Sequence, residues 1–186
     1  TQKYLELIEK SVLKLDDFIS DIIKYSRNSR MDLFVREINF YELLDESINS
    51  LKFMEDAEQV RSIRNIHVHA PFYSDPSRLL MVFNNIISNS VRYRDKRKGD
   101  SYLQIDIYAD AERACIKFSD NGIGIAKEYI ADVFKMFYRA TTDSKGSGLG
   151  LYIVKSAVDK LRGTIQVESE LGQGSSFTIE IPNLQS

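Results

Sequence analysis

Hydrophobic residues in the first thirty positions recur at alternating spacings of three and four. The seam that they form consists of Leu5, Ile8, Val12, Leu15, Ile19 and Ile22. A repeat of about 3.5 residues places these side chains along one line of a helix, where a second helix can pack against them. Leu7, Phe18 and Ile23 widen the line into a stripe, which favours a helix bundle over a two-stranded coil. The alternative, one amphipathic helix lying on its own domain, is disfavoured because the segment contains neither Gly nor Pro.

From residue 35 onward the hydrophobic period changes repeatedly, which predicts strands and helices in turn. Strands are expected at 35–38, 63–69, 102–109, 114–119, 164–169 and 176–181. Helices are expected at 40–55, 76–93, 127–134 and 149–161, with a polar loop at 138–147. Asn39 and Asp75 are the expected N-caps of the first two helices. Pro76 fits a first helical turn because an N–H group there has no partner within the helix.

Four of the expected strands form two hairpins, around the turns at 110–113 and 170–174. Hairpins with helices between them predict an α+β fold. We expect a two-layer α/β sandwich with a mostly antiparallel mixed sheet and helices on one face, preceded by a long bundle-forming helix. The pattern changes after Arg30, so residues 1–31 are assigned to the helix and residues 32–186 to the globular domain.

Composition excludes several classes of protein. The 25 Lys and Arg residues nearly balance the 27 Asp and Glu residues, giving a net charge of -2, so the overall charge gives no reason to expect a nucleic-acid partner. The basic run at 92–98 ends a predicted helix, where cations oppose the helix dipole, and is better explained in that way. No apolar run is long enough to span a bilayer. Cys115 lies in an apolar alternation and is expected to be a buried small residue rather than a reactive thiol.

Three glycine clusters are candidates for ligand binding, at 120–125, 146–151 and 172–176. Taken alone, the first and third lie at strand ends, where such glycines form turns more often than ligand sites. The second directly precedes a helix, where free N–H groups and the positive end of the helix dipole can hold phosphate oxygens. It is not a Walker A loop, because the Gly-Lys pair is missing, and no cluster has the Gly-x-Gly-x-x-Gly spacing of dinucleotide folds.

The helix predicted at 76–93 carries a polar stripe beside its apolar face, formed by Asn85, Asn89 and Arg92. An Asn oxygen can bind Mg²⁺ without adding negative charge beside phosphates, and Arg can neutralise phosphate oxygens. By itself the stripe is equally consistent with a solvated helix face.

Together these motifs resemble, in order and spacing, the catalytic ATP-binding domain of sensor histidine kinases. That superfamily also includes gyrase, the heat-shock chaperone ATPases and the mismatch-repair ATPases. The matching segments are the N box at 85–93, the glycine boxes at 120–125 and 146–151, the phenylalanine box at 134–139 and the final glycine element at 172–177. The resemblance covers about residues 35–182. The preceding helix resembles the second helix of the family's dimerisation and phosphotransfer domain.

The resemblance implies a fold of the histidine kinase ATPase type that binds ATP and Mg²⁺. It implies Asn89 as the principal Mg²⁺ ligand with Asn85 assisting, Asp120 as acceptor of the adenine amine, and residues 138–147 as a mobile lid. The full implied nucleotide-binding set is Asn85, Asn89, Arg92, Tyr93, Asp120, Gly122, Gly124, Ile125, Phe137, Gly146, Ser147, Gly148, Leu149, Gly150, Leu151 and Ser175. Ser90, Arg92 and Ser176 depart from the residues common in the family but roughly preserve size or charge.

The reaction implied is transfer of the ATP γ-phosphoryl to a histidine, for relay to an aspartate on a response-regulator receiver domain. The phosphoacceptor histidine is expected on a helix preceding this sequence, so no catalytic residue is assigned within it. A homodimer through the N-terminal helix and a cytoplasmic location are expected, whether or not the parent protein is anchored in a membrane. His67 and His69 alternate on a predicted strand without an acidic neighbour, so we expect structural or surface histidines; a metal pair would lack a third ligand.

Two other functions fit the same motifs. One is an ATP-binding signalling module without kinase activity, for which the presence of both Asn89 and Asp120 is unfavourable. The other is a serine kinase or ATPase of the same superfamily, for which the long N-terminal helix is unfavourable.

Overall fold

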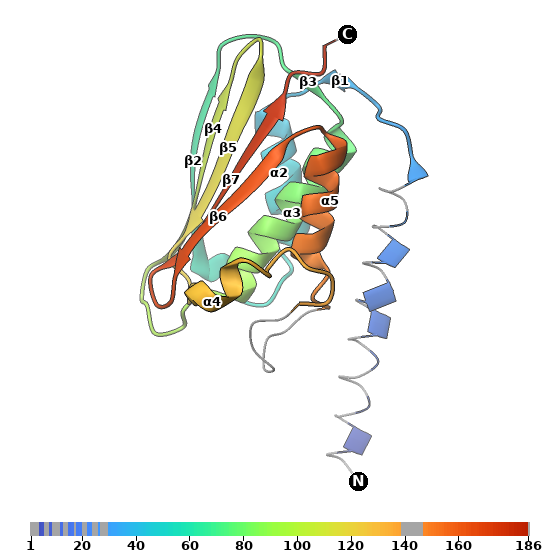
Figure 1. Cartoon of the computed structure of the whole chain (residues 1–186). Helices are drawn as coiled ribbons and strands as arrows, with labels where there is room; N and C mark the ends of the chain where they lie inside the picture. The colour runs from blue at the N-terminus through green and yellow to red at the C-terminus, as the bar shows by residue number, and fades with distance from the viewer. Residues whose placement is uncertain are drawn as a thin grey trace.

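Strands and helices segregate into two layers, a twisted sheet and a set of helices on one of its faces (Figure 1). The structure, a computed structural model, describes residues 30–138 and 147–185. In the N-terminal segment it describes Tyr4, Leu5, Ile8, Val12, Leu15, Asp16, Phe18, Ile19, Ile22, Ile23 and Ser26. Most of the expected lid, including Gly146, lies outside the described residues.

The main sheet has five strands in the order β2-β4-β5-β7-β6. They are β2 (Val60–Val68), β4 (Ser101–Ala109), β5 (Arg113–Asp120), β6 (Thr164–Glu170) and β7 (Gly174–Pro182). The pairs β4–β5, β5–β7 and β6–β7 are antiparallel and β2–β4 is parallel. Inward residues of β4 and β5 are buried in strict alternation, which one covered sheet face requires. Both predicted hairpins and the mostly antiparallel mixed sheet are confirmed.

Three helices cover the inner face of the sheet: α2 (Phe40–Leu51), α3 (Pro76–Arg92) and α5 (Gly150–Lys160) (Figure 1). Both predicted caps are present, because the side chain of Asn39 accepts from the N–H groups of Tyr41 and Glu42, and that of Asp75 accepts from the N–H of Arg78. The predicted two-layer fold with helices on one face is therefore confirmed.

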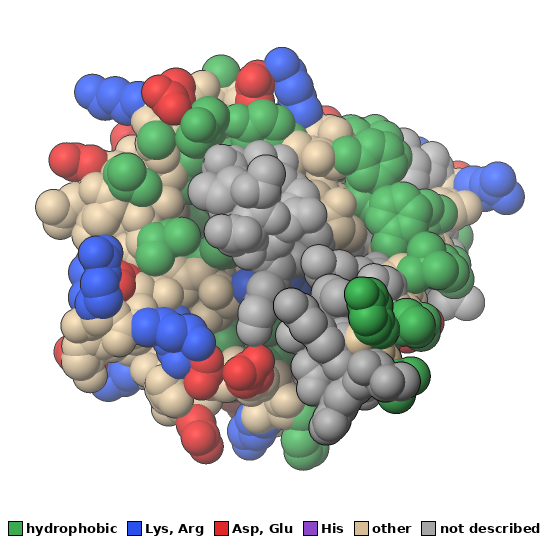
Figure 2. Space-filling model, turned by 90° about the horizontal axis from the view of Figure 1, so that it is seen from below, with side chains coloured by type: hydrophobic (Ala, Val, Ile, Leu, Met, Phe, Trp, Pro, Cys, Tyr) green, Lys and Arg blue, Asp and Glu red, His purple; other side chains and the backbone are tan. Residues whose placement is uncertain are grey.

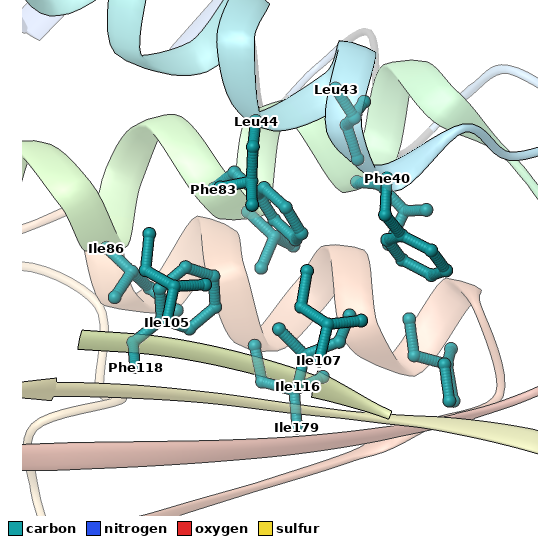
Figure 3. Close-up of a cluster of buried hydrophobic side chains, with 14 of the residues drawn as sticks. Phe40, Leu43, Leu44, Phe83, Ile86, Ile105, Ile107, Ile116, Phe118 and Ile179 are labelled. Carbon is teal, nitrogen blue, oxygen red and sulfur yellow. The ribbon is translucent and has the colours of Figure 1, made fainter. Parts of the chain in front are cut away.

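The core lies between these helices and the sheet (Figure 3). Phe83 of α3 meets Phe118 of β5 edge to face, with ring centroids 5.2 Å apart. Phe40 of α2 packs on Phe72, and Ile105 and Ile116 are fully buried beneath them. Since α3 presents its apolar face to this core, its polar stripe must face elsewhere.

Several boundaries differ from those predicted. Helix α2 ends at Leu51 rather than near residue 55, because the chain turns at Asp56, which has φ 68° and forms ion pairs with Arg94 and Lys96. Helix α4 spans only Lys127–Ile130; the segment after it continues in turns, with the N–H of Lys135 donating to the carbonyl of Asp132.

Two short elements were not predicted as such. Strand β1 (Arg36–Glu37) lies within the expected strand at 35–38, but its antiparallel partner β3 (Tyr73–Ser74) was not foreseen. The 3-10 turn η1 (Ala57–Gln59) precedes β2, which begins at residue 60 rather than 63.

A buried ion pair holds the segment that joins the N-terminal helix to the domain. Asp75 and Arg78 are 2% and 4% exposed and pair with each other at the start of α3. The Arg78 guanidinium also donates to the carbonyls of Met31 (2.6 Å) and Asp32 (3.3 Å), and Asp75 accepts from the N–H of Phe34 (3.0 Å). Residues 31–34 are thus bound through their backbone to helix α3.

Every described residue between Tyr4 and Arg30 is helical, so the helix prediction is confirmed at those positions. The seam residues Leu5, Ile8, Val12, Leu15, Ile19 and Ile22 remain 39% to 62% exposed. Among the described residues, no helix is long and apolar enough to cross a membrane.

We predict that Asp75→Ala destabilises the domain by about 3–5 kcal/mol, because it removes a buried carboxylate that pairs with the Arg78 guanidinium and accepts from the N–H groups of Arg78 and Phe34. Asp45→Ala is the matched control, since it removes an ion pair in which Asp45 is 63% exposed and Arg64 35% exposed, and such pairs contribute about 0–1 kcal/mol. Denaturant unfolding measures both. Equal losses in the two variants would contradict this role of the buried pair.

Candidate nucleotide site

A pocket of about 410 Å³ opens at the end of the molecule where the first glycine turn, α4 and the β6–β7 turn meet helices α3 and α5. Its lining is mostly apolar, with a few polar groups. The residues are Asn89, Tyr93, Asp120, Ile123, Gly124, Ile125, Ala126, Glu128, Tyr129, Val133, Tyr138, Leu151, Leu171, Ser175 and Phe177. Hydrophobic side chains are also plentiful on the surface of this end of the molecule (Figure 2). A concave apolar pocket with few polar groups is typical of a small-molecule site.

Asp120 is held rigidly at the end of β5. One carboxylate oxygen accepts from the backbone N–H of Gly122 (2.8 Å) and of Ser175 (3.3 Å). The other accepts from the hydroxyl of Ser90, which lies 3.5 Å away on α3. The carboxylate is therefore fixed from three elements while lining the pocket.

Burial raises the pKa of the Asp120 carboxyl above its ordinary value of 3.8. The hydrogen bonds from Gly122, Ser175 and Ser90 and the positive charge of Lys98 act in the opposite direction. An acceptor kept in an apolar pocket in this way suits a ligand that supplies an N–H donor.

Close backbone contacts explain the glycines around Asp120. Gly124 has φ +68°, and a Cβ there would collide with the carbonyl of Glu170 at the end of β6. Gly174 has φ +122°, and a Cβ there would collide with the carbonyl of Asp120. The loops that form the pocket rim pack backbone against backbone, which only glycine permits.

The two asparagines of α3 that are predicted to hold Mg²⁺ have different surroundings. Asn89 lines the pocket. The side-chain N–H of Asn85 donates to the carbonyl of Met81 one turn earlier (2.8 Å), while its oxygen lies 3.0 Å from where a Cβ of Gly150 would stand. A side chain at position 150 would thus crowd Asn85 at the start of α5.

Of the residues predicted to bind nucleotide, seven line the pocket: Asn89, Tyr93, Asp120, Gly124, Ile125, Leu151 and Ser175. Asn85 and Gly150 face each other next to it, Gly122 packs on the Tyr93 carbonyl, and Gly148 packs on the backbone of residues 137–138. Ser147 accepts from the N–H of Leu149, which is fully buried, and Arg92 is exposed.

The structure does not bring Phe137 to the pocket, contrary to the expectation. Its backbone has φ 62°, its side chain is 51% exposed, and its ring stacks on Phe18 of the N-terminal helix with centroids 5.7 Å apart. The Phe137 ring thus contacts the N-terminal helix and is not among the side chains that line the pocket.

Sequence reasoning missed much of the apolar wall. Tyr129, Val133 and Tyr138 line the pocket from α4 and the segment after it, with the two tyrosine rings 6.4 Å apart. Leu171 lines it from the β6–β7 turn although it is 66% exposed. Only the exposed Leu171 in a polar turn gave a signal in the sequence, because an apolar residue in a tight turn has no packing reason to be there.

His67 on β2 and His69, which directly follows the end of that strand, are both exposed, as expected of surface histidines. Within the part of the chain that the structure describes, no group of three His, Cys, Asp or Glu side chains could hold a metal ion.

A family model described as "Histidine kinase-, DNA gyrase B-, and HSP90-like ATPase" matches residues 74–185, which include α3, the pocket and the rest of the sheet apart from β2. The chain belongs to this family. The resemblance stated from the motifs is therefore confirmed, and the five-stranded sheet with its helices is the ATPase domain of that family.

Histidine kinases are among the chain's relatives by sequence. The circadian input-output histidine kinase CikA of Synechococcus elongatus is 30% identical, with 97% of this chain and 25% of CikA covered. The sensor histidine kinase CpxA of Escherichia coli is 29% identical, with 97% of this chain and 40% of CpxA covered. The chain thus spans a quarter to two fifths of the length of these two relatives.

Solved structures agree on the fold. Full-length ShkA in complex with AMPPNP is 23% identical and superposes with a TM-score of 0.78 over 100% of this chain and 39% of ShkA. The histidine kinase AdeS of Acinetobacter baumannii is 24% identical, with a TM-score of 0.76 over 100% of this chain and 86% of AdeS.

We predict that Asp120→Asn leaves the ligand-free ATPase domain as stable as the wild type or more stable at pH 7. The amide keeps an oxygen for the two N–H donors but removes a charge whose burial is unfavourable. The pKa of Asp120 is raised in the folded domain, so the free-energy cost of its buried charge is fully present above that pKa. This cost disappears as the pH falls towards 3.8. The advantage of the variant should shrink in the same range.

Asp110→Asn is the matched control, because Asp110 also accepts from two backbone N–H groups, those of Glu112 and Arg113. These bonds lower its pKa, so its charge stabilises the fold above pH 3.8 and Asp110→Asn should destabilise it at pH 7. Thermal unfolding at several pH values measures both variants. A loss of stability in Asp120→Asn as large as that in Asp110→Asn would refute the assigned cost of the Asp120 charge.

Proposed function

We propose that this domain binds ATP with Mg²⁺ and transfers its γ-phosphoryl to a histidine of a two-component sensor histidine kinase, for relay to a response-regulator aspartate. The observation that supports it most is the position of Asp120, a fixed carboxylate inside an apolar pocket that Asn89 also lines. The kinship with CikA and CpxA supports the reaction class.

Adenine fits the apolar end of the pocket. Asp120 would accept a hydrogen bond from its exocyclic amine, a donor that guanine lacks at the same position. Tyr93, Leu171 and Phe177 line the same pocket and would contact the faces and edges of the ring. Because the carboxylate is desolvated, an unpaired oxygen there would be costly, which favours the base that supplies a donor.

The phosphates would lie toward Asn89, Asn85 and the start of α5. The N–H groups of the first turn and the dipole of this eleven-residue helix favour anions at that end. Asn89 and Asn85 would hold Mg²⁺ through their amide oxygens. The Asn85 amide nitrogen is bound to the Met81 carbonyl, which leaves its oxygen directed at Gly150, 3.0 Å from where a Cβ there would stand. Bound Mg²⁺ would neutralise phosphate charge, and Arg92 would add a second cation.

The residues of this domain supply positioning and charge rather than a nucleophile. Asp120 and Tyr93 would fix the base, and the α3 stripe would orient the phosphates. The attacking histidine would come from the dimerisation domain, to which we assign residues 1–31, in the same or a partner subunit. A homodimer through the exposed seam of residues 5–22 and a receiver domain are the partners proposed.

We predict that the chain binds Mg-ATP at least tenfold more tightly than Mg-GTP in calorimetry, because only adenine donates to Asp120 (about 1.4 kcal/mol). Asn89→Ala should weaken Mg-ATP binding, and Asp120→Ala should abolish the preference for adenine. The exposed Asn65→Ala on β2 is a control outside the pocket and should bind as the wild type does.

The same variants test the reaction in the parent protein. Incubation with γ-labelled ATP should give acid-labile label on the wild type and on Asn65→Ala, and little on Asn89→Ala. Equal affinity of the wild type for the two nucleotides, or undiminished labelling of Asn89→Ala, would overturn the proposed function.

We predict that the seam drives self-association. Val12 and Ile19 are 59% and 48% exposed in the single chain, and covering such side chains gains about 25 cal/mol per Å² of apolar area. Val12→Glu with Ile19→Glu should shift the chain toward monomer in sedimentation, whereas Asp16→Lys, which lies off the seam, should not. A wild-type monomer at all concentrations would contradict the bundle assignment without affecting the ATP site.

A further inference from the structure

Three loops meet on the outer side of Asp120. They are the segment after α3 (residues 93–100), the glycine turn after β5 (residues 121–125) and the β6–β7 turn (residues 171–173). The last two contribute Ile123, Gly124 and Leu171 to the pocket lining, so their relative position sets the width of the proposed base pocket.

Lys98 joins all three. Its ammonium, half-buried, donates to the carbonyl of Asn121 and to the carbonyl of Gly172, both at 2.8 Å. Its own backbone N–H donates to the carbonyl of Asp95 (3.0 Å), which fixes the loop that presents it. One side chain thus binds a carbonyl on each of the two loops that enclose the pocket.

Other hydrogen bonds also connect these loops, and the N–H of Ile123 donates to the carbonyl of Tyr93 (3.0 Å). The N–H of Gly172 donates to the carbonyl of Ile123 (2.7 Å), and the side chain of Asn121 bonds the backbone of Asp100 and Tyr102. Without the ammonium, the carbonyls of Asn121 and Gly172 would both face a half-buried space with no cation between them, and carbonyl dipoles pointing at one site repel each other.

The Lys98 ammonium also acts on the carboxylate of Asp120. Asn121 directly follows Asp120, and the charge of Lys98 favours the ionised carboxylate against the cost of its burial. The backbone contacts and the charge therefore act on the same group.

We propose that Lys98 is a positioning residue that closes the base pocket: it ties the glycine turn to the β6–β7 turn and so holds Asp120 and Leu171 at the separation that adenine requires. This inference rests on the proposed function. Lys98 is not among the residues that line the pocket and is not assigned to contact the nucleotide.

The test compares Lys98→Met, Lys98→Arg and Lys96→Met. Lys98→Met keeps the length of the side chain and removes its donors and charge, whereas Lys98→Arg keeps both. Lys96→Met makes the same charge change two residues away, where the ammonium is exposed and pairs with Asp56 instead. Calorimetry with Mg-free ADP and GDP measures the base pocket without the metal.

We expect Lys98→Met to bind ADP roughly tenfold more weakly, as loss of hydrogen bonds to a charged donor implies, and GDP with little change. Lys98→Arg should stay within about threefold of the wild type, and Lys96→Met should bind as the wild type does. In NMR spectra, Lys98→Met should shift the amide signals of Gly122 and Gln173, whose peptide units carry the two bonded carbonyls, without nucleotide present.

Each outcome has a distinct meaning. A wild type that prefers ADP, with Lys98→Met binding like Lys96→Met, would overturn the role of Lys98 alone. A folded Lys98→Arg that binds as weakly as Lys98→Met would also overturn it, since a side chain that keeps donors and charge should restore a positioning function. A wild type with no preference for ADP over GDP would overturn the proposed function and this role with it.

Discussion

The orientation of helix α3 about its own axis determines where the site residues lie. Its buried residues Leu79, Val82, Phe83 and Ile86 lock it against the sheet and α2, because a turn of even one residue would expose aromatic and aliphatic side chains to water. With that face fixed, Asn89 has to line the pocket and Tyr93 has to end at its rim. The core therefore supplies the geometry on which any nucleotide contact depends.

The strength of the hydrophobic pattern decided what could be predicted from the sequence. Helix α3 and both hairpins follow from residue periodicity and from caps such as Asp75, which act locally. The family's motifs located Asn89, Asp120 and Ser175, since those residues are fixed in spacing. The sequence could not reveal the pairing of β1 with β3, or Arg78 bound to Met31, because these contacts join segments more than thirty residues apart.

The remaining misses have physical causes of the same kind. Tyr129 in α4 and Val133 in the turns after it line the pocket together with residues of α3 and β5, a long-range arrangement that no local period shows. Lys98 looked like one member of a solvated basic run, and only its distances to two carbonyls set it apart from Lys96. Phe137 was assigned from its motif alone, and the positive φ that turns its ring toward Phe18 had no signature in the sequence.

Arg78 and Asn89 are eleven residues apart on the same helix, a distance of about 16 Å along its axis. The carbonyls of Met31 and Asp32 are therefore attached to one end of a stiff rod whose other end lines the pocket. A displacement of residues 31–34 therefore either breaks their hydrogen bonds to Arg78 and Asp75 or carries the start of the rod with it. The connection to the N-terminal segment and the pocket-lining Asn89 thus share a single element of secondary structure.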